Sequence, residues 1–336
     1  MAGSRKRVSA AGSPPPGDEP AARQVFDLAW RGEHEMAIEQ ATRALQAKGL
    51  TDPERLELLD LRSESLIAQG HLDRAAEEAA QMVKLAKAAK SDALLAQALG
   101  RQAVVQMRLG DHEAATVNAA RSLKAARKCK SAALEALSLF RLAEAQFRKA
   151  SSHEEAASNA ARAARVYEEL GDVMGQGRAL WALAAARTNQ GRAQESREAA
   201  LKALALGRRC GDLYSAGNAL NMLTFNEPDI AARLRCLNQA LDAFETSGYL
   251  ERQAVATNNL SLVYIRLGLY HRARRLARYS RDIYHRTASR YGFASASLLQ
   301  ASIELVMGHL DSARTLAREA SALINQLQFE IGRAHV

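Results

Sequence analysis

The fold of this chain is decided most clearly by residues 250–287, which read LERQAVATNNLSLVYIRLGLYHRARRLARYSRDIYHRT. One helix-forming segment ends at Leu267-Gly268, and a second one carries Ala273, five residues after the glycine. A glycine at the end of a helix readily adopts the left-handed conformation that stops the helix. The stretch therefore predicts two helices joined by a tight turn.

The same skeleton recurs along the whole chain. The position five residues after the glycine or its substitute falls at 37, 75, 115, 156, 196, 232, 273 and 313, so the steps run from 36 to 41 residues. Two copies are degenerate, with Ser151 and Glu227 in the glycine position. A near-constant period of this size is typical of an array in which each unit packs on its neighbours. We therefore predict an all-α fold, an α-solenoid of seven or eight antiparallel helix pairs without a β-sheet.

Cap and turn residues predict where the helices begin and end. Thr51–Glu54 combines capping side chains with a proline in the first turn and an acid at the positive end of the helix dipole. Ser91 and Ser131 each follow a basic helix end and are predicted N-caps. Later joints carry glycine, where a left-handed residue is expected. These joint glycines are Gly171, Gly211 and Gly248.

The second helix of each pair carries a small residue at the repeat position and another one four residues later. Residues four apart lie on one face of a helix, so each second helix is predicted to carry a notch that lets a neighbouring helix approach closely. The pairs are Ala37/Ala41, Ala75/Ala79, Ala115/Ala119, Ala156/Ala160, Ser196/Ala200, Ala232/Cys236, Ala273/Ala277 and Ala313/Ala317.

These residues resemble the tetratricopeptide repeat (TPR). Tyr264 followed by LGLYHRA at 267–273 matches the pattern of that family, and the resemblance covers about Ala21–Leu327. The period of about forty residues exceeds the 34 of the standard repeat and is similar to the longer-helix variety of kinesin light chain, which Asn258–Tyr264 resembles closely. Alanine replaces the usual large aromatic residue in most second helices, and the proline that closes the standard repeat is missing. The resemblance implies a right-handed superhelix whose first helices line a concave groove.

Composition bounds the class of protein. Only 5% of the 336 residues are aromatic, which predicts a thin core between closely packed helices. Three cysteines without CxxC spacing argue against a disulfide framework or a zinc site and favour a reducing cytoplasm. No run is long and apolar enough for a membrane span, and no secretory signal is visible. The net charge of +9 permits an acidic partner.

Three segments are expected along the chain: a disordered N-terminal tail at 1–19, the solenoid at 20–329 and a non-repeat end at 330–336. The tail combines basic residues with Ser, Ala, Gly and Pro and cannot bury enough apolar surface to fold. The array stops near Leu327 without a polar capping helix. Ile331–Val336 resembles the in-frame translation of a common sequencing-library adapter, so we expect these residues to be a sequencing artefact and the natural protein to be longer.

No motif of catalysis, cofactor binding or metal binding is found, and none of these is predicted. The chain lacks a GK[ST] phosphate loop, a GxSxG elbow and an HExxH helix. A zinc site needs three or four ligands around one point, whereas the histidines near the repeat turns occur one per repeat. We therefore interpret them as turn residues that replace the tyrosine of the family. They are His34, His71, His112, His153, His271 and His309.

A basic stripe on the seventh second helix leaves two interpretations open. Arg274, Arg278 and Arg281 share one face of that helix. Second helices face outward in such arrays, so the stripe is either a solvated convex face or a contact for phosphate or an acidic partner.

The leading functional prediction is a cytoplasmic, non-enzymatic scaffold that binds a peptide or protein segment in its concave groove. The alternative is the sensory or regulatory region of a larger signalling protein. It follows from a resemblance to the Ala/Arg-rich bacterial arrays attached to class III nucleotide cyclases or helix-turn-helix regulators. A nucleic-acid-associated scaffold is the weakest class, and no membrane partner is predicted.

Six side chains are predicted to face or border the groove. They lie nine or ten residues before a repeat glycine or its substitute, or one turn from such a position. An asparagine amide both donates and accepts, so it can clamp the backbone of an extended peptide; the alternative is that the asparagines bond within the helix stack. By resemblance to kinesin light chain, Asn259 would make such a clamp, while tryptophan and arginine would add an apolar contact and a charge. The six are Asn258 and Asn259, Asn218 and Asn221, and Trp181 and Arg178.

Overall fold

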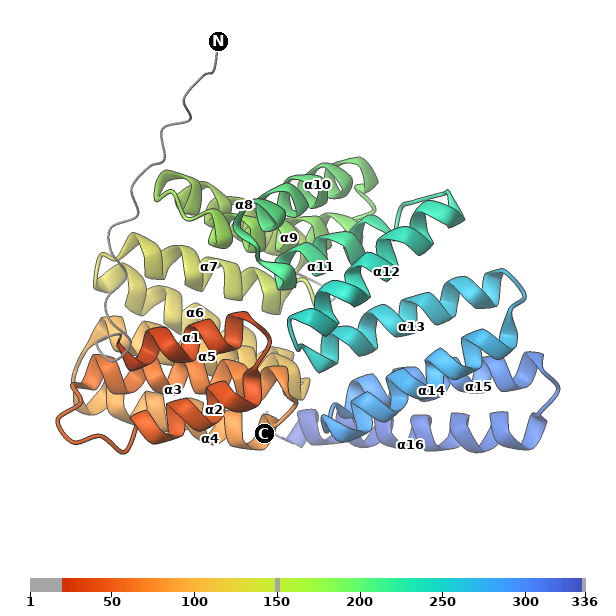
Figure 1. The fold of residues 1–336 in the computed structure, drawn as a ribbon, viewed down its shortest axis with the longest axis horizontal. Helices are drawn as coiled ribbons and strands as arrows, with labels where there is room; N and C mark the ends of the chain where they lie inside the picture. Colours follow the sequence, from red (N-terminus) through yellow and green to blue (C-terminus); the bar gives the residue numbers. More distant parts are fainter. Residues whose placement is uncertain (1–19, 149–151, 334–336) are drawn as a thin grey trace, which may run out of the picture.

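The computed structural model describes residues 20–148 and 152–333, and every regular element in these ranges is an α-helix (Figure 1). The sixteen helices of the described residues form eight antiparallel pairs. They are α1 (Ala21–Trp30), α2 (His34–Ala44), α3 (Asp52–Ala68), α4 (Leu72–Ala88), α5 (Asp92–Leu109), α6 (His112–Lys128), α7 (Ala132–Gln146), α8 (His153–Glu169), α9 (Val173–Asn189), α10 (Ala193–Cys210), α11 (Leu213–Leu223), α12 (Ile230–Thr246), α13 (Leu250–Arg266), α14 (Tyr270–Arg286), α15 (Arg290–Val306) and α16 (Leu310–Arg333).

The predicted all-α solenoid is confirmed. Each helix packs on the next, and first helices also pack on first helices: α1 on α3, onward to α11, and α13 on α15. First helices therefore form the inner layer of the array. The last helix runs to Arg333, beyond the end expected at residue 329. The predictions for 1–19 and 334–336 lie outside the described residues.

The predicted cap and turn chemistry is present. The backbone N–H of Thr51 donates to Glu54 (2.9 Å), and the N–H of Glu54 donates back to the Thr51 hydroxyl (3.4 Å). The hydroxyls of Ser91 and Ser131 accept from N–H groups of the first turns of α5 and α7. The joint glycines have φ between +71° and +77°. The residues before those two serines, Lys90 and Lys130, also have positive φ. Lysine thus occupies a left-handed turn position that the sequence pattern assigned only to glycine.

The small-residue notches hold the helix stack together. Ala115 and Ala119 of α6 are fully buried, and Ala115 belongs to the same apolar cluster as Leu72 and Val104. In the degenerate sixth unit the corresponding Ala232 is only half-buried. Close helix approach therefore depends on a methyl-sized side chain in the regular units.

Replacing Ala115 by Trp is expected to destabilise the fold by roughly 1–3 kcal/mol or more, because overpacking forces neighbouring helices apart. Urea unfolding measures the change. Val117→Trp is the control, because Val117 lies on the same helix with 50% of its surface exposed. Equal unfolding free energies for the two variants would contradict a tight notch.

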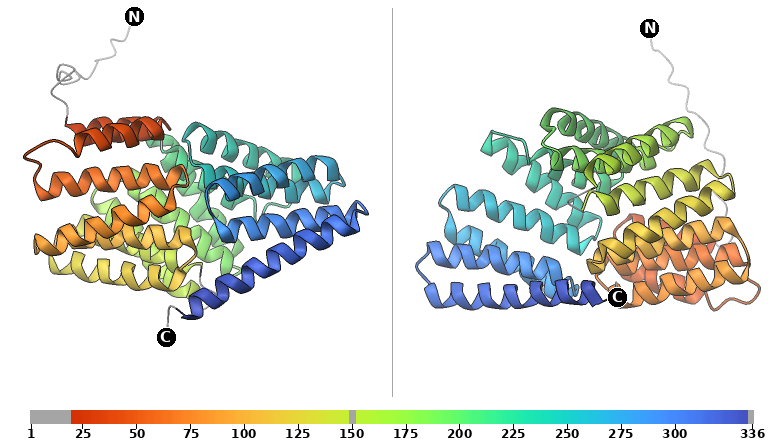
Figure 2. Two further views of the ribbon diagram at one scale, coloured as in Figure 1. Left: turned by 90° about the horizontal axis from the view of Figure 1, so that it is seen from below. Right: turned by 180° about the vertical axis from the view of Figure 1, so that it is seen from behind.

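The array curves until its two ends meet. In Figure 1 the chain follows an arch from the orange N-terminal units through the green middle units to the blue C-terminal units, and Figure 2 shows the two ends beside each other. His34 Nε2 lies 2.9 Å from the carbonyl oxygen of Ser247. The side chain of Gln69 donates to the carbonyl of Gly248 (3.1 Å), and the Tyr249 hydroxyl donates to Glu64 (2.9 Å). The first two helix pairs thus contact the α12–α13 turn.

Glycines make this contact possible. A Cβ at Gly32 would lie 2.3 Å from the carbonyl oxygen of Thr246, and a Cβ at Gly70 would lie 2.3 Å from Cγ2 of Thr287. The α1–α2 and α3–α4 turns therefore press against the α12–α13 and α14–α15 turns. We call these two turn-to-turn contacts, with the hydrogen bonds of His34 and Gln69, the closure.

Candidate functional site

The closure brings the two parts of the array together around an interior that stays partly open to solvent. A large cavity of about 620 Å³ lies between α5, α7 and the start of α8 on one side and α13 and α15 on the other. Two smaller cavities of about 260 and 320 Å³ adjoin each other, since both are lined by Arg101, Arg178 and Tyr214. The 620 and 260 Å³ cavities take their walls from both the N-terminal and the C-terminal part of the array, so these two depend on the closure. The 320 Å³ cavity is lined by residues between Glu64 and Tyr214.

Ion pairs between first helices line the smaller cavities. The guanidinium of Arg101 on α5 bonds to Asp60 (2.7 Å) and to Glu64, both on α3. Arg178 on α9 bonds to Asp212, the N-cap of α11 (2.8 Å). Burial by itself raises the pKa of Glu64, but the charge and hydrogen bond of Arg101, the charge of Arg178 and the hydrogen bond from Tyr249 together hold that pKa well below its usual range. Glu64 therefore stays ionised inside the solenoid.

Aromatic side chains form the wall between the cavities. The indole of Trp181 contacts Phe147 and Tyr214 edge to face, with centroids 6.0 and 6.3 Å apart. Tyr214 packs on Tyr249 with a centroid distance of 4.5 Å. The guanidinium carbon of Arg252 lies 5.8 Å from the Trp181 ring and 5.9 Å from the Tyr214 ring. Rigid rings and charged groups thus alternate along the interior.

Two of the six predicted groove residues belong to this interior. Arg178 lines both smaller cavities, whereas Trp181 is buried in the aromatic wall.

The four asparagines make hydrogen bonds within the helix stack. Asn259 donates to Asn221 (2.7 Å), Asn258 accepts from the hydroxyl of Ser280 (3.3 Å), and Asn218 donates to a carbonyl of its own helix (2.9 Å). In the described structure none of the four lines the cavities above. Their contact with a ligand stays a prediction.

The charged residues of the interior were not singled out from the sequence. A signal for them exists: Arg101 and Arg108 are seven residues apart and share the inner face of α5, and Glu144 and Arg148 are one turn apart. Charged side chains on the apolar face of a repeat helix are rarely buried without a partner. Such pairs on first helices could have indicated the interior network.

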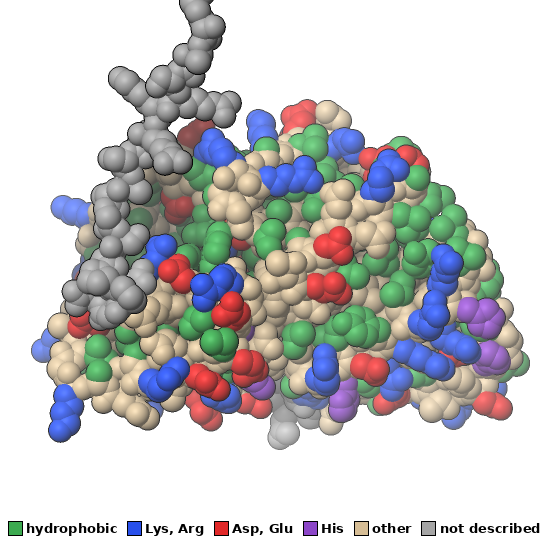
Figure 3. Space-filling model, viewed as in Figure 1, with side chains coloured by type: hydrophobic (Ala, Val, Ile, Leu, Met, Phe, Trp, Pro, Cys, Tyr) green, Lys and Arg blue, Asp and Glu red, His purple; other side chains and the backbone are tan. Residues whose placement is uncertain are grey.

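The basic stripe of α14 is paired with the next two helices. Arg274 and Arg278 each lie 3.6 Å from Glu304, and Arg281 lies 3.3 Å from Glu319. Basic and acidic side chains are interspersed over the lower part of the face seen in Figure 3. The stripe therefore joins helices and does not form a uniform basic field.

Some of the repeat histidines do more than occupy a turn: one is buried at the closure, and two line the large cavity. His34 is buried and lies between Ser65 Oγ (3.2 Å) and the Ser247 carbonyl, and burial lowers its pKa. His112 and His153 line the large cavity. Among the described residues no group of three metal-ligating side chains lies close enough to hold an ion. No helix in the described ranges has the length and apolarity to cross a membrane.

Solved structures share the fold. No family model and no curated protein matches the sequence. A Rap protein complexed with competence and sporulation factor is similar with a TM-score of 0.63 and 12% identity, over 92% of this chain and 97% of that one. The Cut9–Hcn1 hetero-tetramer of the APC/C gives a TM-score of 0.64 with 18% identity, over 90% of this chain and 52% of that one.

A third similar structure carries the name of the repeat. It is a signal-transduction ATPase with numerous domains and a tetratricopeptide-repeat sensor from Pyrococcus horikoshii, with a TM-score of 0.52 and 14% identity over 85% of this chain and 46% of that one. At such identities the likeness concerns the fold. The helix pairs, the turn glycines and these neighbours together identify the chain as a solenoid with the fold of the tetratricopeptide-repeat proteins.

Proposed function

We propose that the chain is a non-enzymatic receptor that holds a peptide or an extended protein segment in its interior. The observation that carries the proposal is the interior itself, with three cavities lined by aromatic rings and fixed charges. Concave sites with apolar walls and a few fixed polar groups are the usual form of ligand sites. The similar Rap structure was solved as a complex with competence and sporulation factor, which supports binding of a guest by this architecture.

The charge pattern favours a peptide over a nucleic acid. Acidic groups such as Asp60, Glu64 and Asp212 lie beside the arginines of the smaller cavities. A polyphosphate backbone would be repelled by these carboxylates, whereas a peptide offers donors, acceptors and charges of both signs. The interior is also narrower than a duplex requires, since its cavities hold a few hundred cubic ångströms each.

Filling the interior is expected to abolish binding. Peptides selected from a random display library against the whole chain would serve as probes, with affinities measured by calorimetry. Leu137 is half-buried and lines both smaller cavities, so Leu137→Trp should weaken binding at least about tenfold, the equivalent of about 1.4 kcal/mol.

Leu201→Trp is the matched control, because Leu201 lies exposed on the outer helix α10. Its affinity should equal that of the unchanged protein. Loss of binding in Leu201→Trp but not in Leu137→Trp would place the ligand on the convex face, and a library without any selectable peptide would refute the proposed receptor.

A further inference from the structure

The large cavity contains a buried arginine that makes no direct ion pair. Arg252 on α13 is only 9% exposed, and its Nε has no hydrogen-bond partner. Among the described residues no carboxylate lies within 4.0 Å of its guanidinium; the group rests instead over the rings of Trp181 and Tyr214. A buried cation without a partner is costly, because it has lost its water without gaining an ion pair.

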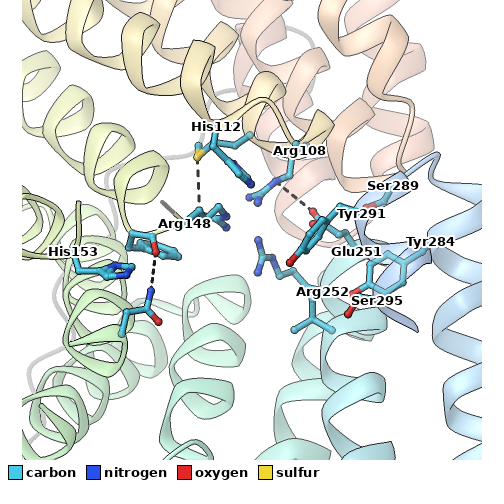
Figure 4. Close-up of a pocket in the computed structure, with 16 residues that line it drawn as sticks. Arg108, His112, Arg148, His153, Glu251, Arg252, Tyr284, Ser289, Tyr291 and Ser295 are labelled. Atoms are coloured by element: carbon cyan, nitrogen blue, oxygen red, sulfur yellow. Dashed lines mark hydrogen bonds and ion pairs between the residues drawn. The ribbon is translucent and has the colours of Figure 1, made fainter. Parts of the chain in front are cut away.

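Two further guanidinium groups reach the same space from the opposite wall. Figure 4 shows Arg108 and Arg148 pointing into the cavity toward Arg252. Arg108 and Arg148 share the carboxylate of Glu144, at 3.3 and 3.2 Å, and Arg108 also lies 3.4 Å from Glu251. In the described part of the cavity three guanidinium groups thus face two carboxylates, so one positive charge remains uncompensated.

The surroundings of Arg148 disfavour its positive charge. Burial lowers the pKa of Arg148 to about 10, and the neighbouring charges of Arg108 and Arg252 act in the same direction. An additional negative charge at this point would relieve both the mutual repulsion and the missing ion pair of Arg252. The empty space beside the three groups is large enough for such a guest, with apolar contacts available from Phe147 and Val255.

We propose that the large cavity is a carboxylate-binding subsite, in which Arg252 and Arg148 receive one carboxylate of the bound peptide from opposite sides. The inference rests on the proposed peptide receptor and deepens it by naming the chemistry that the ligand must carry. The planar guanidinium group is suited to a carboxylate, because its N–H groups match the two oxygens in a fork. The carboxylate comes either from the C-terminus of the peptide or from an Asp or Glu side chain.

The position of this subsite couples binding to the closure. Arg148 follows α7 in the N-terminal part of the array, whereas Arg252 belongs to α13, directly after the α12–α13 turn that forms the closure. A carboxylate held by both arginines joins the two parts. Ligand binding therefore stabilises the closed array, and opening of the closure releases the ligand.

The subsite is tested first with a small probe. Acetate and acetamide are titrated at equal ionic strength into the whole chain carrying ¹⁵N-labelled arginine, and the side-chain Nε–H signals are followed by NMR. The signal of Arg252 is identified by its absence in Arg252→Gln. We expect a saturable shift of the Arg252 and Arg148 signals with acetate and none with acetamide.

Variants separate the subsite from general charge effects. Arg252→Gln should weaken acetate binding at Arg148 at least about tenfold. Arg252→Lys keeps the charge but not the forked guanidinium, so its acetate affinity should lie between those of the unchanged protein and Arg252→Gln. Arg209→Gln is the control. Arg209 is exposed on the outer helix α10 and should leave acetate binding unchanged. Equal shifts with acetate and acetamide, or undiminished acetate binding in Arg252→Gln, would mean an adventitious ion only.

The library-selected peptides then identify the source of the carboxylate. Each peptide is compared with the same peptide carrying a C-terminal amide, and with forms in which Asp is replaced by Asn or Glu by Gln. One of these changes should weaken binding at least about tenfold in the unchanged protein and have little effect in Arg252→Gln. Peptides that bind in the interior without needing any carboxylate would overturn the subsite while the receptor proposal stands. Acetate binding without any selectable peptide would support the anion site and refute the receptor.

Discussion

Glu144→Gln is expected to destabilise the protein by about 3–5 kcal/mol, because removing one member of a buried ion pair leaves the other charge without compensation. The Glu144 side chain is 4% exposed and bonds to both Arg108 and Arg148. Without it Arg148 has no carboxylate partner within the described residues, and the cavity holds three guanidinium groups against Glu251 alone. Urea unfolding at neutral pH measures the loss.

The same helix offers a matched control. Glu135 also bridges two arginines, Arg127 and Arg162, but the glutamate is 23% exposed and both partners are about half exposed. Glu135→Gln should therefore cost less than about 1 kcal/mol. Similar losses for the two substitutions would show that burial of Glu144 has no energetic consequence.

Acid should reduce the difference in unfolding free energy between Glu144→Gln and the unchanged protein. Burial by itself raises the pKa of Glu144, but the charges of Arg108, Arg148 and Arg252 together outweigh it, so this pKa lies below the ordinary value of 4.5. A carboxyl group with a lowered folded-state pKa stabilises the fold above the unfolded-state pKa and loses this contribution as the pH falls through the folded-state value. Unfolding curves of the two proteins should accordingly converge below about pH 4.5.

The double variant Gly32→Ala with Gly70→Ala is expected to open the array. Each new Cβ would meet the opposite turn at 2.3 Å, and at Gly32 the obstacle is a backbone carbonyl that cannot rotate away. The closure contacts must then separate, which removes the C-terminal wall of the 620 Å³ cavity and of the 260 Å³ cavity. Small-angle X-ray scattering should report a larger radius of gyration, and affinity for selected peptides should fall at least about tenfold, since the closed state is the one that binds.

A second double variant serves as the control for the effect of backbone strain. Gly191 and Gly308 have φ of +73° and +82°, close to the +80° and +81° of Gly32 and Gly70, yet nothing lies within 4 Å of a Cβ at either position. Gly191→Ala with Gly308→Ala carries the same left-handed strain of roughly 1–2 kcal/mol per residue without the clash. Superimposable scattering curves for the two double variants would show that the turns do not hold the array closed.

The repeat architecture could be predicted because its determinants are local. A glycine such as Gly268 stops a helix whatever lies elsewhere in the chain, and a notch such as Ala115/Ala119 needs only the adjacent helix. Spacing alone therefore predicted seven or eight helix pairs, and eight are present in the described residues. Lys90 and Lys130 escaped the pattern, since a lysine in a left-handed turn has no sequence signal of its own.

The interior could not be predicted from the same pattern. Which side chains of α13 reach the cavity depends on the small rotation between successive units, added over the whole array. The register of the repeat pointed to Asn258 and Asn259, whereas Arg252 lines the large cavity. The buried role of His34 depends likewise on Ser247, a residue 213 positions away.

The 213-residue span of that hydrogen bond changes how the molecule unfolds. An open solenoid behaves as a one-dimensional chain whose terminal units fray first and independently. Joining the ends gives the terminal unit a second neighbour, so fraying must break the joint as well, and the transition becomes more cooperative. The joint also fixes the number of units: removing one leaves every remaining nearest-neighbour interface intact but shifts the rotation that brings His34 to Ser247. A protein with such a deletion should still fold, but as an open solenoid whose ends do not touch.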